Sequence, residues 1–290
     1  MGISLGHFRS GHTPAPCRGT AVMGIVNLTP DSFSGGGAPA PTPEEARDIA
    51  LRHVAEGARI IDFGAESTRP GSSPLDAGEE LRRLGEVVRL TRKETSAPLS
   101  VDTYRVETAR AVLDQGADII NDVTALKGFF SPDAKGDSGM AGLAAREKAQ
   151  VVVMHAPAEP RIMRDAPRYG DAVAEVNAFL AARARFALAA GIARERIWLD
   201  PGFGFGKDFG DNRELLLRLD ETAALGYPVL AGLSRKRMIA DALGLPPHER
   251  LEASLALAVA AALRGAAIVR VHDVRATARA IGMINRLRDA

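Results

Sequence analysis

LSVDTYRVETARAVLDQGADIINDV, residues 99–123, contains the sequence pattern of one complete strand–helix–strand unit. Two continuous apolar runs, 99–103 and 118–123, flank a segment with helical periodicity at 106–115, which ends at Gly116. Continuous apolar runs are typical of strands that are covered on both faces, as in parallel sheets. A helix that ends at a left-handed glycine can lead directly into the next strand. The stretch therefore predicts two parallel strands joined by a crossover helix.

The same unit recurs along the whole chain. Eight apolar runs are predicted as strands: 21–27, 59–64, 99–103, 118–123, 151–155, 197–201, 228–234 and 268–273. Between them we expect helices, among them one that begins at Pro43 with Thr42 as its N-cap and one at 214–225 that ends at Gly226. Eight such units indicate an α/β fold, a single (β/α)₈ TIM barrel. An open doubly wound sheet is the alternative, but residues able to do chemistry at nearly every strand end favour the closed barrel.

Composition limits the class of protein. The 290 residues are 46% hydrophobic and 25% charged, which is typical of a soluble globular domain. We expect residues 19–290 to form the barrel and residues 1–18 to be an amino-terminal lead. A formal net charge of +1 predicts no nucleic-acid partner, and no apolar run is long enough to predict a membrane span. The single cysteine, Cys17, excludes an internal disulfide framework and favours the cytoplasm.

Acidic and amide side chains stand at the ends of four predicted strands. Asp62, Asp102, Asn121 and Asp200 should converge at one mouth of the barrel. Buried carboxylates need hydrogen-bond donors, and no row of histidines with zinc-ligand spacing accompanies them. A planar ligand with amide N–H and amine groups would satisfy them. The alternative, strongest for Asp62, is that some of these carboxylates accept hydrogen bonds from loop amides or helix N-termini.

Cations and hydroxyls stand at other strand ends and predict a phosphate site. Ser234 and Lys236 end the seventh predicted strand, and Arg270 and His272 end the eighth. Loops after the last two strands of such barrels commonly bind phosphate. Arg69 and Thr68, in the loop that follows the second strand, could share the same anion. Asn27 is a neutral oxygen ligand that suits Mg²⁺ held mostly by water and phosphate.

Two kinds of loop should complete this mouth. Long Gly/Pro-rich loops at 28–37 and 66–74 follow the first two strands and could close over a substrate. After the sixth strand, the string DPGFGFGK (200–207) has glycines, Gly204 among them, that allow close approach of the backbone, while Phe205 offers a stacking face. The segment 127–142 is predicted to be a surface excursion without a functional role.

Taken together, these motifs closely resemble those of the dihydropteroate synthase family, in the same order and over nearly the whole chain past the lead. The matching strings are VMGIVNLTPDSFS (22–34), IDFGAESTRPG (61–71), SVDT (100–103), IND (120–122), LDPGFGFGK (199–207), SRK (234–236) and RVHD (270–273). The resemblance implies condensation of 6-hydroxymethyl-7,8-dihydropterin pyrophosphate with 4-aminobenzoate. The products are 7,8-dihydropteroate, in folate biosynthesis, and pyrophosphate.

The resemblance also implies roles for individual residues. Asp102, Asn121 and Asp200 would bind the pterin edge, with Lys236, Gly204, Met154 and Phe205 around the ring. Asn27 would contact Mg²⁺ and pyrophosphate, and Thr68, Arg270 and His272 would contact the anion. Phe33, Pro70, Ser234 and Lys236 would receive 4-aminobenzoate. Lys236, Arg69, Asp102 and Asp200 are the expected catalytic residues. The resemblance also implies a homodimer and a family that sulfonamides target. The alanine-rich segment 251–263 is a candidate interface helix, although its apolar surface would equally serve barrel packing.

The chain departs from the family pattern at a few positions. Gly35 stands where an aspartate is expected, Ala65 replaces a usual glycine, and Ala156 follows His155 in place of the expected methionine. None of these positions belongs to the expected pterin or pyrophosphate set. Two other functions stay open: a barrel that passes a methyl group from methyltetrahydrofolate to a corrinoid, and a paralogue that binds pterin without turnover.

Overall fold

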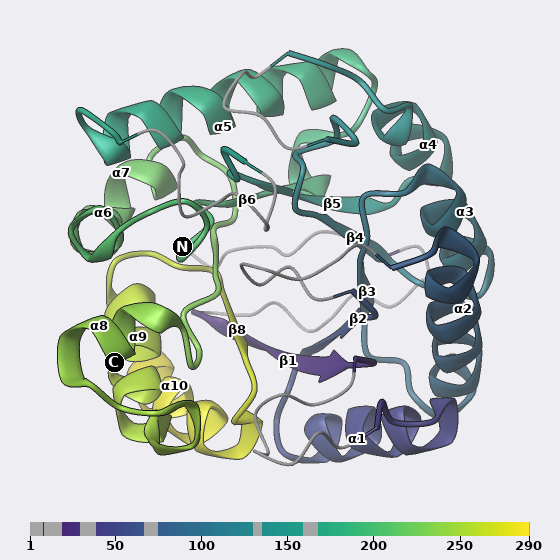
Figure 1. The fold of residues 1–290 in the computed structure, drawn as a ribbon, viewed down its shortest axis with the longest axis horizontal. Helices are drawn as coiled ribbons and strands as arrows, with labels where there is room; N and C mark the ends of the chain where they lie inside the picture. The colour runs from purple at the N-terminus through teal and green to yellow at the C-terminus, as the bar shows by residue number, and fades with distance from the viewer. Residues whose placement is uncertain are drawn as a thin grey trace.

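The computed structural model describes Phe8 and residues 19–29, 39–66, 75–129, 135–158 and 168–289. These residues form a ring of parallel strands surrounded by helices (Figure 1). The strands are β1 (Ala21–Asn27), β2 (Ile60–Gly64), β3 (Leu99–Asp102), β4 (Ile119–Asp122), β5 (Gln150–Met154), β6 (Ile197–Asp200), β7 (Leu230–Ala231) and β8 (Ile268–Val271). They pair in the order β6-β5-β4-β3-β2-β1-β8-β7. A parallel bridge between Leu199 and Val229 joins β6 to the residue before β7. The sheet therefore meets itself as a barrel, and the open doubly wound alternative is wrong.

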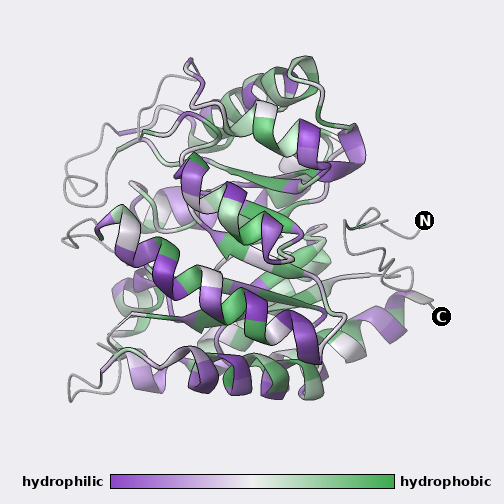
Figure 2. Ribbon diagram, turned by 90° about the vertical axis from the view of Figure 1, so that its right-hand side faces the viewer, coloured by the Kyte–Doolittle hydropathy of each residue, from purple (hydrophilic) through white to green (hydrophobic). Residues whose placement is uncertain are grey.

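The helices lie outside the strands and carry both hydrophilic and hydrophobic residues, whereas the strands are mostly hydrophobic (Figure 2). They are α1 (Pro43–Ala55), α2 (Ala77–Glu94), α3 (Val106–Asp114), α4 (Met140–Glu147), α5 (Ala172–Ala189), α6 (Phe209–Leu217), α7 (Leu219–Ala223), α8 (Arg237–Leu243), α9 (Leu251–Leu263) and α10 (Val274–Asp289). Two short 3₁₀ turns, η2 (Arg194–Arg196) and η3 (Pro247–Glu249), lie between them. Among the described residues, no helix is long and apolar enough to cross a bilayer.

The predicted helix signals act as expected at α1 and α3. Thr42 accepts a hydrogen bond from Glu45 N (3.2 Å) and donates its own N–H to the Glu45 carboxylate (2.8 Å), so the two residues form a capping box. Gly116 follows α3 with a φ of +105°, and an added Cβ would lie 2.8 Å from Arg92 Cγ. Only glycine therefore fits this turn without strain.

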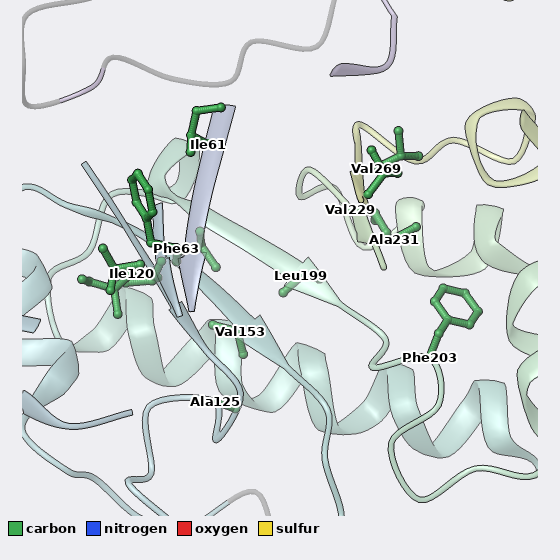
Figure 3. Close-up of a cluster of buried hydrophobic side chains, with 14 of the residues drawn as sticks. Ile61, Phe63, Ile120, Ala125, Val153, Leu199, Phe203, Val229, Ala231 and Val269 are labelled. Carbon is green, nitrogen blue, oxygen red and sulfur yellow. The ribbon is translucent and has the colours of Figure 1, made fainter. Parts of the chain in front are cut away.

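Alternation along the strands divides the apolar side chains into two layers. Ile60, Ile119, Val152, Trp198 and Ile268 belong to one buried cluster, which also contains Phe8, and Phe8 lies edge-on to Trp198 with ring centroids 6.3 Å apart. Their sequence neighbours belong to a second cluster that includes helix residues, and Figure 3 shows some of these side chains, among them Ile61, Ile120, Val153, Leu199 and Val269. The first group faces the barrel interior and the second faces the helices.

Two residues farther along each strand, the interior positions change from apolar to functional. Counting on from the interior cluster in steps of two leads to Asp62, Asn121, Met154, Asp200 and Arg270. The registers place Asp102 beside Asn121 and Met154 beside Asp200 on neighbouring strands. The same alternation that builds the core therefore directs these side chains to the carboxyl end of the barrel.

Three details differ from the sequence-based predictions. The seventh strand has two residues instead of seven, because Pro228 has no N–H for a strand ladder and the chain turns at Leu233, whose oxygen accepts the Lys236 N–H. The helix predicted at 214–225 begins earlier and is two helices, α6 and α7, which meet at Arg218 (φ −112°, ψ 26°). The segment 127–142 is partly interior: Lys127 is buried and its ammonium lies 5.0 Å from the ring centre of Phe179.

Candidate functional site

An ion-pair network of strand residues occupies the center of the barrel mouth. Arg270 Nε donates to Asp62 Oδ2 (2.6 Å) and its Nη2 lies 3.4 Å from Asp102 Oδ2. Ser100 Oγ donates to Asp62 Oδ1 (2.5 Å), and Asn121 Nδ2 lies 3.5 Å from Asp62 Oδ2. Asp62 is fully buried, and these donors satisfy its carboxylate. The carboxylate in turn holds Arg270 in place. The donors are two side chains, on β3 and β4, and an ion-pair partner, whereas the sequence suggested loop amides or helix termini as the alternative.

The other acceptors of the mouth are less fully engaged by the protein. Asn121 Oδ1 is buried and accepts no hydrogen bond from the described residues. Burial raises the pKa of Asp102 to about 7, and the nearby Arg270 opposes the rise. Burial also raises the pKa of Asp200, although its Oδ1 accepts the Gly202 N–H at 2.7 Å. The three side chains therefore suit a ligand that brings its own N–H donors.

Apolar side chains line one side of this acceptor set. Met154 and Phe205 belong to a buried cluster with Val123 and Ala156, and Tyr104 packs against it. Lys236 Nζ lies 4.4 Å from the center of the Phe205 ring, within the range of a cation–π contact. The acceptors and these apolar walls together suit a flat, polar-edged ring system.

The glycines of the loop after β6 are required by close contacts. Gly202 has a φ of +70°, and an added Cβ would lie 2.0 Å from His155 O. Gly204 has a φ of +77°, and its added Cβ would lie 3.2 Å from Lys236 Cδ. The absence of side chains at these two positions lets the loop reach the barrel rim and lets Lys236 pass beside it.

The loop after β7 places Ser234 and Lys236 by a strained turn. Arg235 has a φ of +56°, and its side chain pairs with Asp273 (2.6 and 3.0 Å), away from the mouth. Ser234 Oγ lies 3.1 Å from His272 Nδ1 and accepts the His272 N–H at 3.2 Å. A non-glycine residue in the left-handed region is uncommon and often marks a functional site. Here the turn directs the Arg235 side chain to Asp273, while Ser234 contacts His272 and Lys236 contacts the Phe205 ring.

Asn27 offers one oxygen ligand near the Asp102 carboxylate. An added Cβ on Gly64 would lie 4.0 Å from both Asn27 Oδ1 and Asp102 Oδ2, so glycine leaves room next to these two oxygens. Within the described ranges, no group of three or more His, Cys, Asp or Glu side chains could hold a metal. This arrangement fits a magnesium ion bound chiefly through water and phosphate, with Asn27 as a protein ligand, and does not form a protein cage.

Four of the predicted site residues, Phe33, Thr68, Arg69 and Pro70, lie outside the described residues. The structure brings together Asp102, Asn121, Met154, Asp200, Gly204, Phe205, Lys236 and Arg270, with Ser234 and His272 in contact next to Lys236. Sequence reasoning missed Ser100 and Lys207. Ser100 could have been found by alternation, since it lies two residues before Asp102 on the same strand and therefore shares its face.

Comparisons with known proteins agree with this geometry. The family model described as pterin binding enzyme matches residues 23–272. The dihydropteroate synthase of Streptococcus pyogenes serotype M3 is 43% identical over 269 residues, which cover 92% of this chain and 95% of that protein. The dihydropteroate synthase of Escherichia coli K12 is 42% identical over 263 residues, covering 91% of this chain and 90% of that protein.

Solved structures show the same similarity. Yersinia pestis dihydropteroate synthase in a sulfonamide drug complex has a TM-score of 0.86 at 39% identity, covering 94% of this chain and 95% of that one. The Xanthomonas albilineans enzyme with 4-aminobenzoic acid has a TM-score of 0.83 at 45% identity, with 93% and 94% covered. The same enzyme in complex with 7,8-dihydropteroate has a TM-score of 0.79 at 40% identity, again with 93% and 94% covered.

Proposed function

The chain belongs to the pterin binding enzyme family, and we propose that it is a dihydropteroate synthase, a transferase of folate biosynthesis. It condenses 6-hydroxymethyl-7,8-dihydropterin pyrophosphate with 4-aminobenzoate to give 7,8-dihydropteroate and pyrophosphate. The observation that carries the proposal is the convergence of Asp102, Asn121 Oδ1 and Asp200 beside the wall of Met154 and Phe205. A pterin matches this mouth, because its flat ring carries an edge of amine and amide N–H groups.

The chain's own residues support the reaction in three ways. Asp102, Asn121 and Asp200 hold the pterin edge, while Phe205 and Met154 fix the ring plane and Lys236 contacts the ring. Arg270 supplies positive charge, and Arg270 and His272 supply N–H donors, for the departing pyrophosphate; we assign Arg69 and the Thr68 hydroxyl to the same group. As the C–O bond to pyrophosphate breaks, the amine of 4-aminobenzoate forms the new C–N bond and loses a proton. Phe33, Pro70 and Ser234 are assigned to the 4-aminobenzoate side.

We assign Asn27 as a protein ligand of Mg²⁺, which, when bound with the phosphate oxygens, neutralises charge on the leaving group. The support for this assignment is that Asn27 Oδ1 and Asp102 Oδ2 lie on the same side of Gly64, each 4.0 Å from where a Cβ on that glycine would stand. We also propose that the protein acts in the cytoplasm, in keeping with its single cysteine.

We also propose that the protein is a homodimer. α9 packs against α10, and Leu263, Met283 and Leu287 on these helices are each more than half exposed (58%, 56% and 62%). Large apolar side chains grouped on neighbouring helices are typical of interfaces. A second copy of the chain is the partner that this surface suits.

The experiment that tests the function supplies both substrates with Mg²⁺ and follows 7,8-dihydropteroate by chromatography. Product should form only when both substrates are present, and excess chelator should abolish it while a pterin without pyrophosphate still binds. A paralogue without catalytic activity would bind pterin and form no product. Methyl transfer from methyltetrahydrofolate to a corrinoid, without condensation, would support the methyltransferase alternative and contradict the proposal.

A further inference from the structure

Lys207 ends the glycine-rich string after β6, and its side chain folds back beneath that string. Its Nζ lies 2.9 Å from Gly202 O, 2.9 Å from Phe205 O and 3.0 Å from His155 Nδ1, with His155 O slightly farther at 3.3 Å. An ammonium group has three N–H donors, and the three nearest acceptors can use all of them. Lys207 is thus bound to both ends of the loop segment 202–205.

His155 Nδ1 faces the Lys207 ammonium and accepts from it when the neutral imidazole carries its proton on Nε2. Burial lowers the pKa of His155 well below its ordinary value, and the charge of Lys207 lowers it further. The ring is held edge-on to Phe179, with centroids 4.8 Å apart. Burial lowers the pKa of Lys207 to about 7, and the attraction of Asp200 opposes this change. Three acceptors around one nitrogen favour the ammonium form, because a neutral amine has one N–H fewer to donate.

A second side chain, that of Asn212, also binds this loop. Asn212 of α6 accepts the Gly204 N–H through Oδ1 (2.7 Å) and donates Nδ2 to Lys207 O (3.1 Å) and Asp208 O (2.6 Å). Between these contacts Gly202, Gly204 and Gly206 all have positive φ. Glycine has the greatest backbone freedom of any residue, so this loop depends on side-chain contacts to keep one conformation.

The loop 202–207, held by Lys207 and Asn212, supports two parts of the proposed pterin site, the Asp200 carboxylate and the Phe205 ring. Gly202 donates its N–H to Asp200 Oδ1 (2.7 Å) and accepts from Lys207 through its carbonyl, so one residue, through its two flanking peptide groups, connects the lysine to the carboxylate. Phe205, whose carbonyl also accepts from Lys207, forms the wall beside Lys236 Nζ. Lys207 is turned inward to these contacts and is not among the groups that line the ring.

We propose that Lys207, together with Asn212, is a positioning residue that fixes Asp200 and Phe205 in the geometry that binds pterin. This inference rests on the proposed function, since it takes the slot to be a pterin site. A lysine with only a structural role would change the stability of the fold and leave pterin affinity unaltered. A positioning role instead affects the affinity for one of the two substrates.

The test compares Lys207→Met with the wild-type protein and with Lys93→Met, a control lysine exposed on α2. For Lys207→Met we expect the Kd of a pterin without pyrophosphate, measured by calorimetry, to rise at least about tenfold. The KM for the pterin pyrophosphate should rise similarly, and the KM for 4-aminobenzoate should change less than about threefold. Lys93→Met should alter none of these quantities.

A folded Lys207→Met protein that binds pterin as tightly as wild type overturns the inference. An equal rise in both KM values also overturns it, because that result indicates general loss of structure. Should Lys207→Met fail to fold, Asn212→Ala decides: weakened pterin binding supports the positioning role, and unchanged binding contradicts it. A wild-type protein that binds no pterin would refute the proposed function and this inference with it. Wild-type pterin binding with no rise in Kd in the variants would refute only the positioning role of Lys207 and Asn212.

Discussion

Asp200 Oδ1 accepts the Gly202 N–H, and this contact decides how an amide would sit in its place. In Asp200→Asn the amide oxygen would keep the Gly202 contact, so the NH₂ group would face the ligand where an acceptor is needed. We expect pterin binding to weaken by about 2–4 kcal/mol while the fold is retained. Calorimetry with a pterin analogue measures this. The control is Asp220→Asn, because Asp220 is an exposed carboxylate that pairs with Arg264 at the surface. Unchanged affinity would show that Asp200 does not bind the ring.

Asp102 should make pterin binding depend on pH. Its carboxyl has a pKa of about 7, raised chiefly by burial, so it is largely protonated in the free protein below that pH. A ligand that donates N–H to the carboxylate lowers this pKa, so binding releases a proton below about pH 7 and affinity rises with pH up to that value. Calorimetry at pH 6 in buffers of different ionisation enthalpy should detect the released proton. Asp102→Asn should remove it, and wild-type binding without proton release would contradict the assignment.

At the scale of elements, the loop after β6 should tolerate no side chain at Gly202. In Gly202→Ala the new Cβ would overlap His155 O and the residue would need a positive φ. We expect a loss of at least about 2 kcal/mol in the free energy of unfolding, together with weaker pterin binding. Gly85→Ala in α2 is the control, because its Cβ meets no atom within 4 Å and alanine favours a helix. Denaturant titration compares the two, and a Gly202→Ala protein as stable as wild type would contradict the geometry of this loop.

Elements were predictable where the signal is local. The continuous apolar runs that predict strands and the N-cap at Thr42 are properties of neighbouring residues, and both predictions were confirmed. The short β7 was mispredicted because its apolar pattern continues past the point where the chain turns. The partners of Asp62 could not be predicted, since Arg270 is 208 residues away and the pairing depends on closure of the barrel. The inward fold of Lys207 likewise depends on His155 from another strand end.

At the scale of the whole molecule, the order of the eight predicted strands was enough to predict the barrel and which of its ends carries the site. Parallel strands with functional residues at their carboxyl ends place those residues together whatever the helices do. The strand pattern does not predict the oligomeric state. The apolar residues of α9 serve barrel packing on one side, as Ala258, Ala261 and Ala262 do, and leave Leu263 exposed.

The dimer proposal predicts a change in mass when this surface becomes charged. Leu263→Glu should place a carboxylate in the apolar interface and shift the protein from dimer toward monomer. Multi-angle light scattering measures the mass, and Leu243→Glu, an exposed leucine on α8, is the matched control. A wild-type monomer, or a Leu263→Glu protein that stays dimeric, would contradict an interface formed by α9 and α10.

The central claim is that the acceptors Asp102, Asn121 and Asp200 recognise the N–H edge of a pterin. The most direct measurement compares the Kd of 6-hydroxymethylpterin with that of its analogue in which a carbonyl replaces the exocyclic amine. A site built to accept hydrogen bonds leaves its buried carboxylates unpaired against the analogue, so we predict binding weaker by about a hundredfold or more. Equal affinity for the two compounds would contradict the claim.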